Sequence, residues 1–285
     1  MIKENLINFG GIPEENSSLE NSKIVVLPIP YDGTSTWVKG SDKGPNAILD
    51  ASANMELYDI ETDTEVYLEG IYTAPPVTVN NSPEAMVDAA MAESLSYINK
   101  GKFLVTIGGE HSVSIAPIQA HAKKYQNLSI LQIDAHADLR DSYEGSKNNH
   151  ASVMARAQDV CPIVQVGIRS MDVGEKDRLN PERVFWAHKI TQCDKWMEPA
   201  INLLTDNVYL TIDLDGFDPS ILPSTGTPEP GGLMWYQTLK FLRKVIEQKN
   251  LVGFDVVELC PNPMEKSSDF LAAKLIYKLL SYKFA

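Results

Sequence analysis

The chain has 285 residues, of which 44% are hydrophobic and 22% charged, and this composition excludes intrinsic disorder as its dominant state. Its formal net charge of −13 argues against nucleic-acid binding, which needs a basic surface, and favours either plain solubility or the attraction of a cationic small substrate. No run approaches the ~20 apolar residues of a membrane span, so no membrane partner is expected.

The cysteines and the N-terminal stretch bear on where the protein works. Cys161, Cys193 and Cys260 are widely spaced and form no C-x-x-C pair, so zinc-ribbon and thioredoxin-like proteins find no support. An odd number of cysteines favours a reducing compartment over a disulfide framework. The opening residues MIKENLINFGG contain no apolar core of signal-peptide length. These features predict a cytoplasmic protein.

Short apolar runs with little alternation recur along the chain and predict strands that are buried on both faces. They cover residues 24–29, 103–107, 128–133, 163–167, 184–187, 208–212 and 251–257. Longer amphipathic stretches predict helices between them. These stretches cover residues 83–99, 115–125, 151–158, 196–204, 235–248 and 270–282. Ser82 is a candidate N-cap for the first helix, and Ser267 or Ser268 for the last.

The order of these elements indicates the fold class. Strands that alternate with helices are typical of β-α-β units, which build a parallel sheet with helices on both faces. No repeat, low-complexity tract or Pro/Gly/Ser-rich linker divides the chain. We therefore expect a single α/β domain over residues 1–285, a three-layer α/β/α fold with a mainly parallel central sheet. The order of the strands in the sheet cannot be read from the sequence.

Chemically reactive residues follow four of the predicted strands. In open α/β sheets, ligands bind outside the carboxyl ends of the strands, so the residues just after each apolar run are the first place to look for a site. The four segments read Gly-Gly-Glu-His at 108–111, Asp-Ala-His-Ala-Asp at 134–138, Asp-Leu-Asp at 213–215 and Glu at 258. We expect them to lie along one edge of the sheet.

Six of these side chains have the chemistry of metal ligands. They are His111, Asp134, His136, Asp138, Asp213 and Asp215. If the chain stays extended, residues at i, i+2 and i+4 point the same way, so each Asp-rich motif can converge on one spot. Four carboxylates carry about −4 at their reference pKa values, a charge that two divalent ions would balance. Bridging carboxylates would hold such ions roughly 3.5–4 Å apart.

The donor set also bears on which metal binds. Oxygen ligands with a minority of imidazole and no thiolate favour Mn²⁺ over a structural zinc ion, although zinc or cobalt also suits such a site. Taken alone, Asp-x-Asp after a strand commonly serves turns and helix caps. Two Asp-rich motifs together with Gly-Gly-Glu-His, each at the end of a strand, are hard to explain by turns and favour a two-metal site.

Three segments resemble the signatures of the ureohydrolases, the family of arginase, agmatinase and formimidoylglutamase. They are residues 108–112, 134–138 and 213–219. Residues 30–34 and 44–48 are similar to the family's N-terminal segment, and Gly-Thr-Pro-Glu-Pro-Gly-Gly at 226–232 resembles its agmatinase branch. The resemblance covers nearly the whole chain and implies an arginase-like fold, with two Mn²⁺ ions per chain.

The resemblance also implies how the ligands are shared between the two ions. The first ion is expected on His111, Asp134, Asp138 and Asp213, and the second on Asp134, His136, Asp213 and Asp215. Asp134 and Asp213 would bridge the two. Such a pair of ions lowers the pKa of a bridging water and supplies hydroxide near pH 7.

Three residues are implied to take part in the reaction. His150 resembles the family's mobile histidine, which delivers a proton to the departing amine, although a lone histidine in a polar loop is usually just solvated. Glu258 resembles the glutamate that receives the substrate's guanidinium, although it could also simply end a strand at the surface. Asp138 is expected to orient the hydroxide.

The residues after Asp138 bear on the substrate. Arginase-like members carry an Asn two positions after this aspartate, whereas here the position is Arg140, which resembles the agmatinase branch. We expect agmatine, a small cationic guanidino substrate that is cleaved to putrescine and urea in polyamine biosynthesis. The alternative within this class is 4-guanidinobutyrate or another guanidino acid, for which Arg140 and Lys147 are candidate tail-binding residues.

Two further alternatives belong to other classes. A single-metal acetylpolyamine deacetylase of related fold would require a tandem His pair, which the sequence lacks. A catalytically silent relative would be expected to have lost ligands, and all six are present. The resemblance further implies a homo-oligomer, either a trimer or a hexamer.

Overall fold

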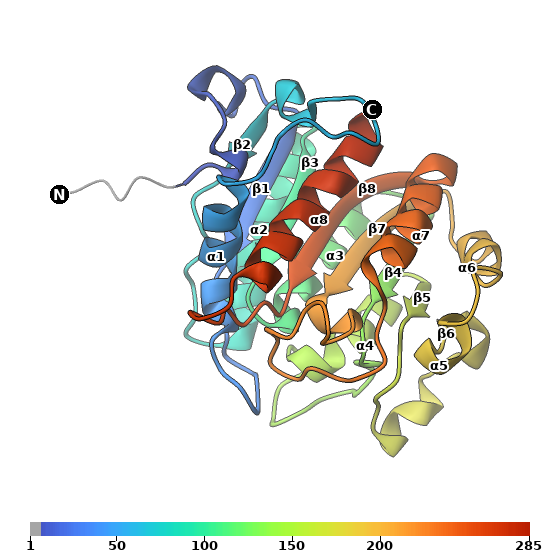
Figure 1. Ribbon diagram of the computed structural model, residues 1–285. Coiled ribbons are helices and arrows are strands. Elements are labelled where there is room, and N and C mark those ends of the chain that lie inside the picture. The colour runs from blue at the N-terminus through green and yellow to red at the C-terminus, as the bar shows by residue number, and fades with distance from the viewer. Residues whose placement is uncertain (1–6) are drawn as a thin grey trace.

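Eight strands form one sheet in the computed structural model of the chain, which describes residues 7–285 (Figure 1). Residues 1–6, with which the stretch MIKENLINFGG and the predicted domain begin, lie outside the described residues. The strands are β1 (Ile24–Ile29), β2 (Ile71–Thr73), β3 (Phe103–Gly108), β4 (Leu128–Ile133), β5 (Ile163–Val166), β6 (Val184–Phe185), β7 (Asn207–Asp213) and β8 (Asn250–Val257). Every pairing between them is parallel, which confirms the predicted α/β class.

Helices cover both faces of the sheet and complete three layers. They are α1 (Gly44–Ser52), α2 (Pro83–Asn99), α3 (Ile115–Lys124), α4 (Val153–Gln158), α5 (Ala187–Ile190), α6 (Met197–Asn202), α7 (Trp235–Gln248) and α8 (Ser267–Phe284). In Figure 1, α1, α7 and α8 lie on one face and α2, α3 and α4 on the other. Alternate strand residues enter the two cores: Ile24 and Val26 of β1 join the first, and Val25 and Leu27 the second.

Capping explains where two of the helices begin. The Ser82 hydroxyl accepts a hydrogen bond from the N–H of Ala85 at 3.1 Å, so the predicted cap of α2 is confirmed. The predicted cap of α8 is wrong, because Ser267 and Ser268 lie inside its first turn and Lys266 is the N-cap residue. The carboxylate of Glu265 accepts a hydrogen bond from the N–H of Ser267, so an acidic residue before the helix supplies the acceptor.

Three elements, β2, α1 and α5, were not predicted, and one predicted strand was too long. Strand β2 has three residues at the edge of the sheet, too few for a clear apolar run. Helix α1 begins at Gly44 and Pro45, residues that usually indicate a turn, although proline suits the first turn of a helix. The run at 184–187 forms a strand only over Val184–Phe185, because α5 begins at Ala187.

No helix within residues 7–285 is both long and apolar enough to cross a bilayer.

The sheet order brings the four motif-bearing strands together. The order is β2-β1-β3-β8-β7-β4-β5-β6, so β3, β8, β7 and β4 are consecutive neighbours at its centre. Their carboxyl ends are level, because Ile107 pairs with Val256, Asp213 with Val257 and Ile133 with Ile212. The reactive segments after these strands therefore meet at one edge, as the sequence predicted.

Candidate metal centre and active-site cavity

His111 is placed by a tight turn at the end of β3. It is the first residue of the 3-10 helix η5 (His111–Ser114), and the carboxylate of Glu110 caps this helix by accepting the N–H of Ser112 at 2.8 Å. The turn needs glycine at position 109, since a Cβ there would lie 1.9 Å from the carbonyl oxygen of Tyr31. The loop after β1 and the turn after β3 can therefore pack against each other.

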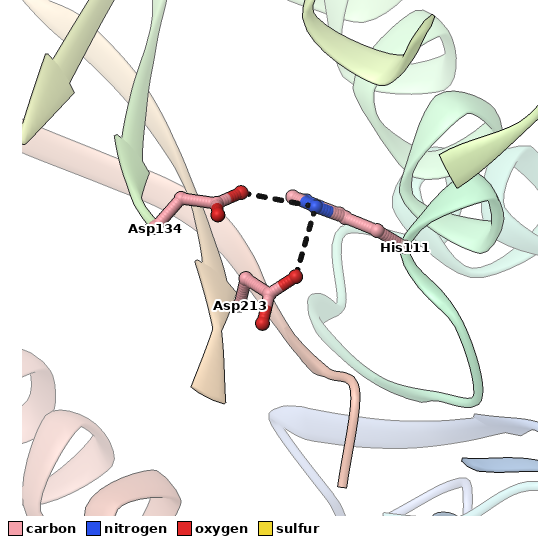
Figure 2. Close-up of side chains that lie close together, drawn as sticks. All are labelled: His111, Asp134 and Asp213. Carbon is pink, nitrogen blue, oxygen red and sulfur yellow. Dashed lines mark ion pairs between the residues drawn. The ribbon is translucent and has the colours of Figure 1, made fainter. Parts of the chain in front are cut away.

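The His111 ring faces carboxylate oxygens from three segments. Nδ1 lies 3.0 Å from Asp138, 3.2 Å from Asp134 and 3.4 Å from Asp213, and Figure 2 shows the last two contacts. Burial by itself would lower the pKa of His111, but these carboxylates outweigh it and raise the pKa well above its ordinary value. On the other side of the ring, Nε2 lies 2.9 Å from Thr211 Oγ1, which leaves Nδ1 as the ligand atom.

A second imidazole meets a second pair of carboxylates next to the first. Nδ1 of His136 lies 2.9 Å from Asp215 and 3.7 Å from Asp134. Two groups of side chains could therefore each hold a metal ion, namely His111 with Asp134 and Asp213, and Asp134 with His136 and Asp215. Asp134 belongs to both groups, so its carboxylate is placed to bridge two ions.

The chain does not stay extended through the two Asp-rich motifs. Asp138 has a φ of +53°, in the left-handed region, so the chain turns before it reaches the third side chain of its motif. Asp215 lies in the 3-10 helix η9 (Leu214–Gly216), not in an extended segment. The aspartates still converge, since oxygens of Asp134, Asp138 and Asp213 all lie within 3.4 Å of His111 Nδ1. Asp213 lies with His111, and its bridging role stays a prediction.

Hydrogen bonds fix the carboxylates in place. Asp134 accepts the side-chain amide of Gln132 on one oxygen and the N–H of His136 on the other, both at 2.6 Å. Asp213 accepts the N–H of Asp215 at 2.9 Å. These partners orient the proposed ligands before any ion binds, as is usual for metal sites.

The electrostatics of the group fit divalent cations. Burial, and then the neighbouring charge of Asp134, raise the pKa of Asp138 to about 7. Burial and the charges of Asp215 and Asp134 also raise the pKa of Asp213 well above its usual range. Within residues 7–285, no hydrogen bond of good geometry reaches the buried Nδ1 of His111, although carboxylate oxygens of Asp134 and Asp138 lie 3.2 and 3.0 Å away. Cations at this point would stabilise the ionised carboxylates and use that nitrogen, so the residues fit a binuclear metal centre.

A cavity of about 330 Å³ opens onto this cluster. Proposed ligands from both metal groups line it, and so do His150 and Glu258. Glu258 has a φ of +66° just beyond β8, where its N–H donates to the carbonyl of Gly109 at 2.8 Å. One carboxylate oxygen of Glu258 accepts the N–H of His111, also at 2.8 Å. Burial and the nearby charge of Glu110 raise the pKa of Glu258 well above its usual range, so a cation beside it would be favoured.

His150 lies on the wall of the cavity, held by a segment far away in the chain. Its Nδ1 lies 3.1 Å from the hydroxyl oxygen of Thr34, which also accepts the backbone N–H of His150 at 3.0 Å. The ring of Tyr143 packs edge-on against the imidazole, with the centroids 5.8 Å apart. Burial, and then the charges of His111 and His136, lower the pKa of His150 to about 4. The ring is therefore neutral at pH 7.

Sequence reasoning missed two residues near the centre. The guanidinium of Arg169 donates to backbone carbonyls of several turns, among them those of Asp215 at 2.6 Å and Glu229 at 2.7 Å. The carboxylate of Glu229 itself lies 3.8 Å from His136 Nε2. Arg169 follows β5, so the rule that strand ends carry function could have indicated it. The motif at 226–232 was noticed, but nothing in it showed that Glu229 would face the cluster.

The fold and the site define an α/β protein with a carboxylate-rich centre for metal ions at the ends of its central strands. Residues 22–281 match the family model of the arginase family. The chain belongs to the arginase family and is a hydrolase of that family.

Relatives resemble the chain over nearly its full length. The N(1)-aminopropylagmatine ureohydrolase of Synechocystis sp. is 39% identical over 280 residues, covering 94% of this chain and 92% of that protein. The agmatinase of Pyrococcus horikoshii is 31% identical over 265 residues, covering 92% of each. The crystal structure of the agmatine ureohydrolase of Thermoplasma volcanium superposes with a TM-score of 0.86 at 28% identity, covering 98% of this chain and 94% of that one. These matches confirm the predicted family and fold.

Proposed function

We propose that this protein hydrolyses a guanidine with a cationic tail and releases urea. The observation that carries the proposal is the pair of overlapping His–carboxylate groups at a cavity that Glu258 also lines. The names of the relatives, which are ureohydrolases and agmatinases, support the same reaction class. A single-metal deacetylase is disfavoured, because two groups of ligands share Asp134.

The six proposed ligands would hold two divalent ions per chain. The first would bind His111 with Asp134, Asp138 and Asp213, and the second would share Asp134 and Asp213 and add His136 and Asp215. Carboxylate oxygens with two imidazoles favour Mn²⁺. When bound, the ions supply hydroxide near neutral pH by lowering the pKa of water.

Glu258 is suited to hold the substrate's guanidinium. Its Oε1 accepts the backbone N–H of His111, and the residue lines the cavity together with several of the proposed ligands. A planar guanidinium can pair with a carboxylate through charge-assisted hydrogen bonds, which fix the orientation of its carbon. Asp138 borders the same cavity and can accept a hydrogen bond from the attacking hydroxide.

His150 is suited to carry a proton to the departing amine. Thr34 occupies Nδ1, so Nε2 is the ring atom that can exchange a proton. With a pKa of about 4, the ring is neutral at pH 7 and must first take up the proton that it passes on. A neutral ring that first takes up a proton and then passes it on acts as a proton shuttle, not as an acid that is already protonated at pH 7.

The tail of the substrate distinguishes two cationic candidates. Agmatine is our first candidate, and the relative at 39% identity makes its N(1)-aminopropyl derivative the second. Asp172 and Glu175 line the cavity, which favours a cationic tail over an acidic one. Lys147 pairs with Asp141 at 3.4 Å and does not line the cavity, so one of the two residues proposed to bind an acidic tail is misplaced for that role.

Urea release by the Mn²⁺-loaded protein tests the proposal. The panel holds agmatine, N(1)-aminopropylagmatine, arginine, 4-guanidinobutyrate and 3-guanidinopropionate. We expect the two compounds with cationic tails to have the highest kcat/KM. Preference for a guanidino acid or for arginine would support the proposed reaction but contradict the proposed cationic substrate. If no compound releases urea, the proposed function is overturned. The trimer or hexamer and the cytoplasmic location remain predictions.

A further inference from the structure

We infer that Arg140 influences whether the cavity prefers a substrate with a cationic or an anionic tail. It does so because its guanidinium pairs with Oδ2 of Asp172. This inference rests on the proposed function. Arg140, Asp172 and Tyr143 all line the cavity. The backbone of Arg140 is fixed by its N–H, which donates to the carbonyl of Ala151 at 3.0 Å. The guanidinium carbon lies 4.7 Å from the centre of the Tyr143 ring, and one of its nitrogens lies 3.6 Å from Asp172 Oδ2.

The carboxylates near Arg140 are not equally open to a ligand. Asp172 Oδ1 accepts the N–H of Gly174 at 2.8 Å, which leaves Oδ2 facing Arg140. Both oxygens of Glu175 already accept backbone N–H groups, from Leu139 at 2.7 Å and from Asp172 at 2.6 Å. Asp172 Oδ2 is therefore the better acceptor for a substrate ammonium, and Arg140 competes for it.

The pair is weak enough for a ligand to break. The side chains of Arg140 and Asp172 are 36% and 47% exposed, and ion pairs in such positions change an equilibrium by only about two- to fivefold. A cationic tail must displace Arg140 from Asp172 and tolerate its charge nearby. An anionic tail would instead gain a guanidinium partner held on the face of Tyr143. Arg140 therefore reduces the preference for cationic tails without touching the reacting atoms.

Substitution of Arg140 separates this role from simple packing. In R140Q, we expect the KM for agmatine to fall about three- to tenfold. The substitution removes two effects that weaken agmatine binding, namely the competition of Arg140 for Asp172 and the repulsion between the two cations. The KM for 4-guanidinobutyrate, or its inhibition constant if it is not cleaved, should rise by a similar factor, and kcat for agmatine should stay within about twofold. In the conservative variant R140K, the ratio of the KM for agmatine to the KM for 4-guanidinobutyrate should stay close to that of the wild type, because lysine retains the positive charge.

K147Q is the matched control, since it removes one positive charge beside Asp141 without altering the cavity wall. Its ratio of KM values should stay within about twofold of the wild type. In a double-mutant cycle, R140Q should have less effect on the KM for agmatine when Asp172→Asn is already present, because both changes break the same pair. Equal shifts for both compounds in R140Q, or the same ratio change in K147Q, would overturn the inference.

A failure of the proposed function would be visible separately. If the wild-type protein releases urea from no compound in the panel, the dissociation constants of putrescine and 4-aminobutyrate, measured by calorimetry, report the same charge preference. R140Q should then bind putrescine about three- to tenfold more tightly than the wild type and 4-aminobutyrate more weakly. An unchanged ratio, or no binding of either amine to either protein, would overturn the role of Arg140.

Discussion

Contacts with distant parts of the chain hold His150 and Glu258. Thr34 Oγ1 lies 3.1 Å from Nδ1 of His150, and the N–H of His111 donates to Glu258 at 2.8 Å. Burial then changes what each side chain can do, since it raises the pKa of Glu258 and lowers that of His150 to about 4. The sequence could name these two residues only through the family resemblance, because neither lies in a motif that is specific by itself.

Replacing His150 by alanine should lower turnover without emptying the metal site. His150 belongs to neither group of proposed ligands, whereas loss of a general acid typically costs 10²–10⁴-fold in rate. We therefore expect H150A to keep its manganese content and to lose about a hundredfold or more in kcat. Metal analysis and urea release on the same preparation measure both quantities.

The exposed His188 is the matched control, because it lies on α5 and does not line the cavity. H188A should retain wild-type kcat. Loss of manganese from H150A would give His150 a role in building the site, and an unchanged kcat would remove it from the reaction.

At the scale of elements, Arg169 joins the turns that surround the metal groups. Its guanidinium donates to carbonyls at the end of β5, in η9 and in the loop at 229–230. The turn that carries Asp215 and the loop that carries Glu229 are thus fastened to one side chain. The buried Gln132, which holds Asp134, has a similar role on β4. Neither residue belongs to either group of proposed metal ligands.

Loss of these bonds in Arg169→Met should weaken metal binding. Residues that orient metal ligands typically contribute 10–100-fold to affinity, so we expect the dissociation constant of Mn²⁺ to rise by about that factor. Calorimetric titration of the metal-free protein measures this dissociation constant. Arg169→Lys should recover only part of the lost affinity, because a single ammonium group cannot donate to as many carbonyls at once as the planar guanidinium does.

Arg183→Met is a suitable control, since Arg183 also donates to a backbone carbonyl, that of Leu203 at 3.1 Å, and does not line the cavity. It should leave Mn²⁺ affinity unchanged. Wild-type affinity in Arg169→Met would show that the turns keep their shape without the guanidinium.

At the scale of the whole molecule, the metal groups connect segments that are far apart in the chain. Residues at or just beyond the carboxyl ends of β3, β4 and β7 contribute His111, Asp134 and Asp213 to one group, and these strands lie in the central part of the sheet. Burial, and then the charges of neighbouring aspartates, raise the pKa of Asp138 and Asp213, so ionised carboxylates are unfavourable here without cations. Bound cations should therefore stabilise the sheet as well as serve the reaction.

Chelation should lower the thermal stability of the protein. An ion present at 100 times its dissociation constant contributes about 2.7 kcal/mol to the free energy of unfolding. For a chain of this size we expect the Tm to fall by roughly 5 °C or more after removal of metal with EDTA, and to return when Mn²⁺ is added. Differential scanning calorimetry measures the shift.

Asp134→Asn provides the control, because it removes the ligand that belongs to both groups. Its Tm should respond weakly to EDTA and Mn²⁺. An equal shift in this variant would place the stabilising ion elsewhere on the protein.

The sequence by itself determined the fold class and most strands and helices, and it indicated the candidate metal ligands. These properties follow from local features: buried apolar runs, helical periodicity, and polar motifs at strand ends. Only the tertiary structure decided the order of strands, the left-handed turn at Asp138, and the contacts of Arg169 and Arg140. Each of these depends on packing between segments distant in the chain, and no local pattern of apolar and polar residues records which distant partner a side chain will meet.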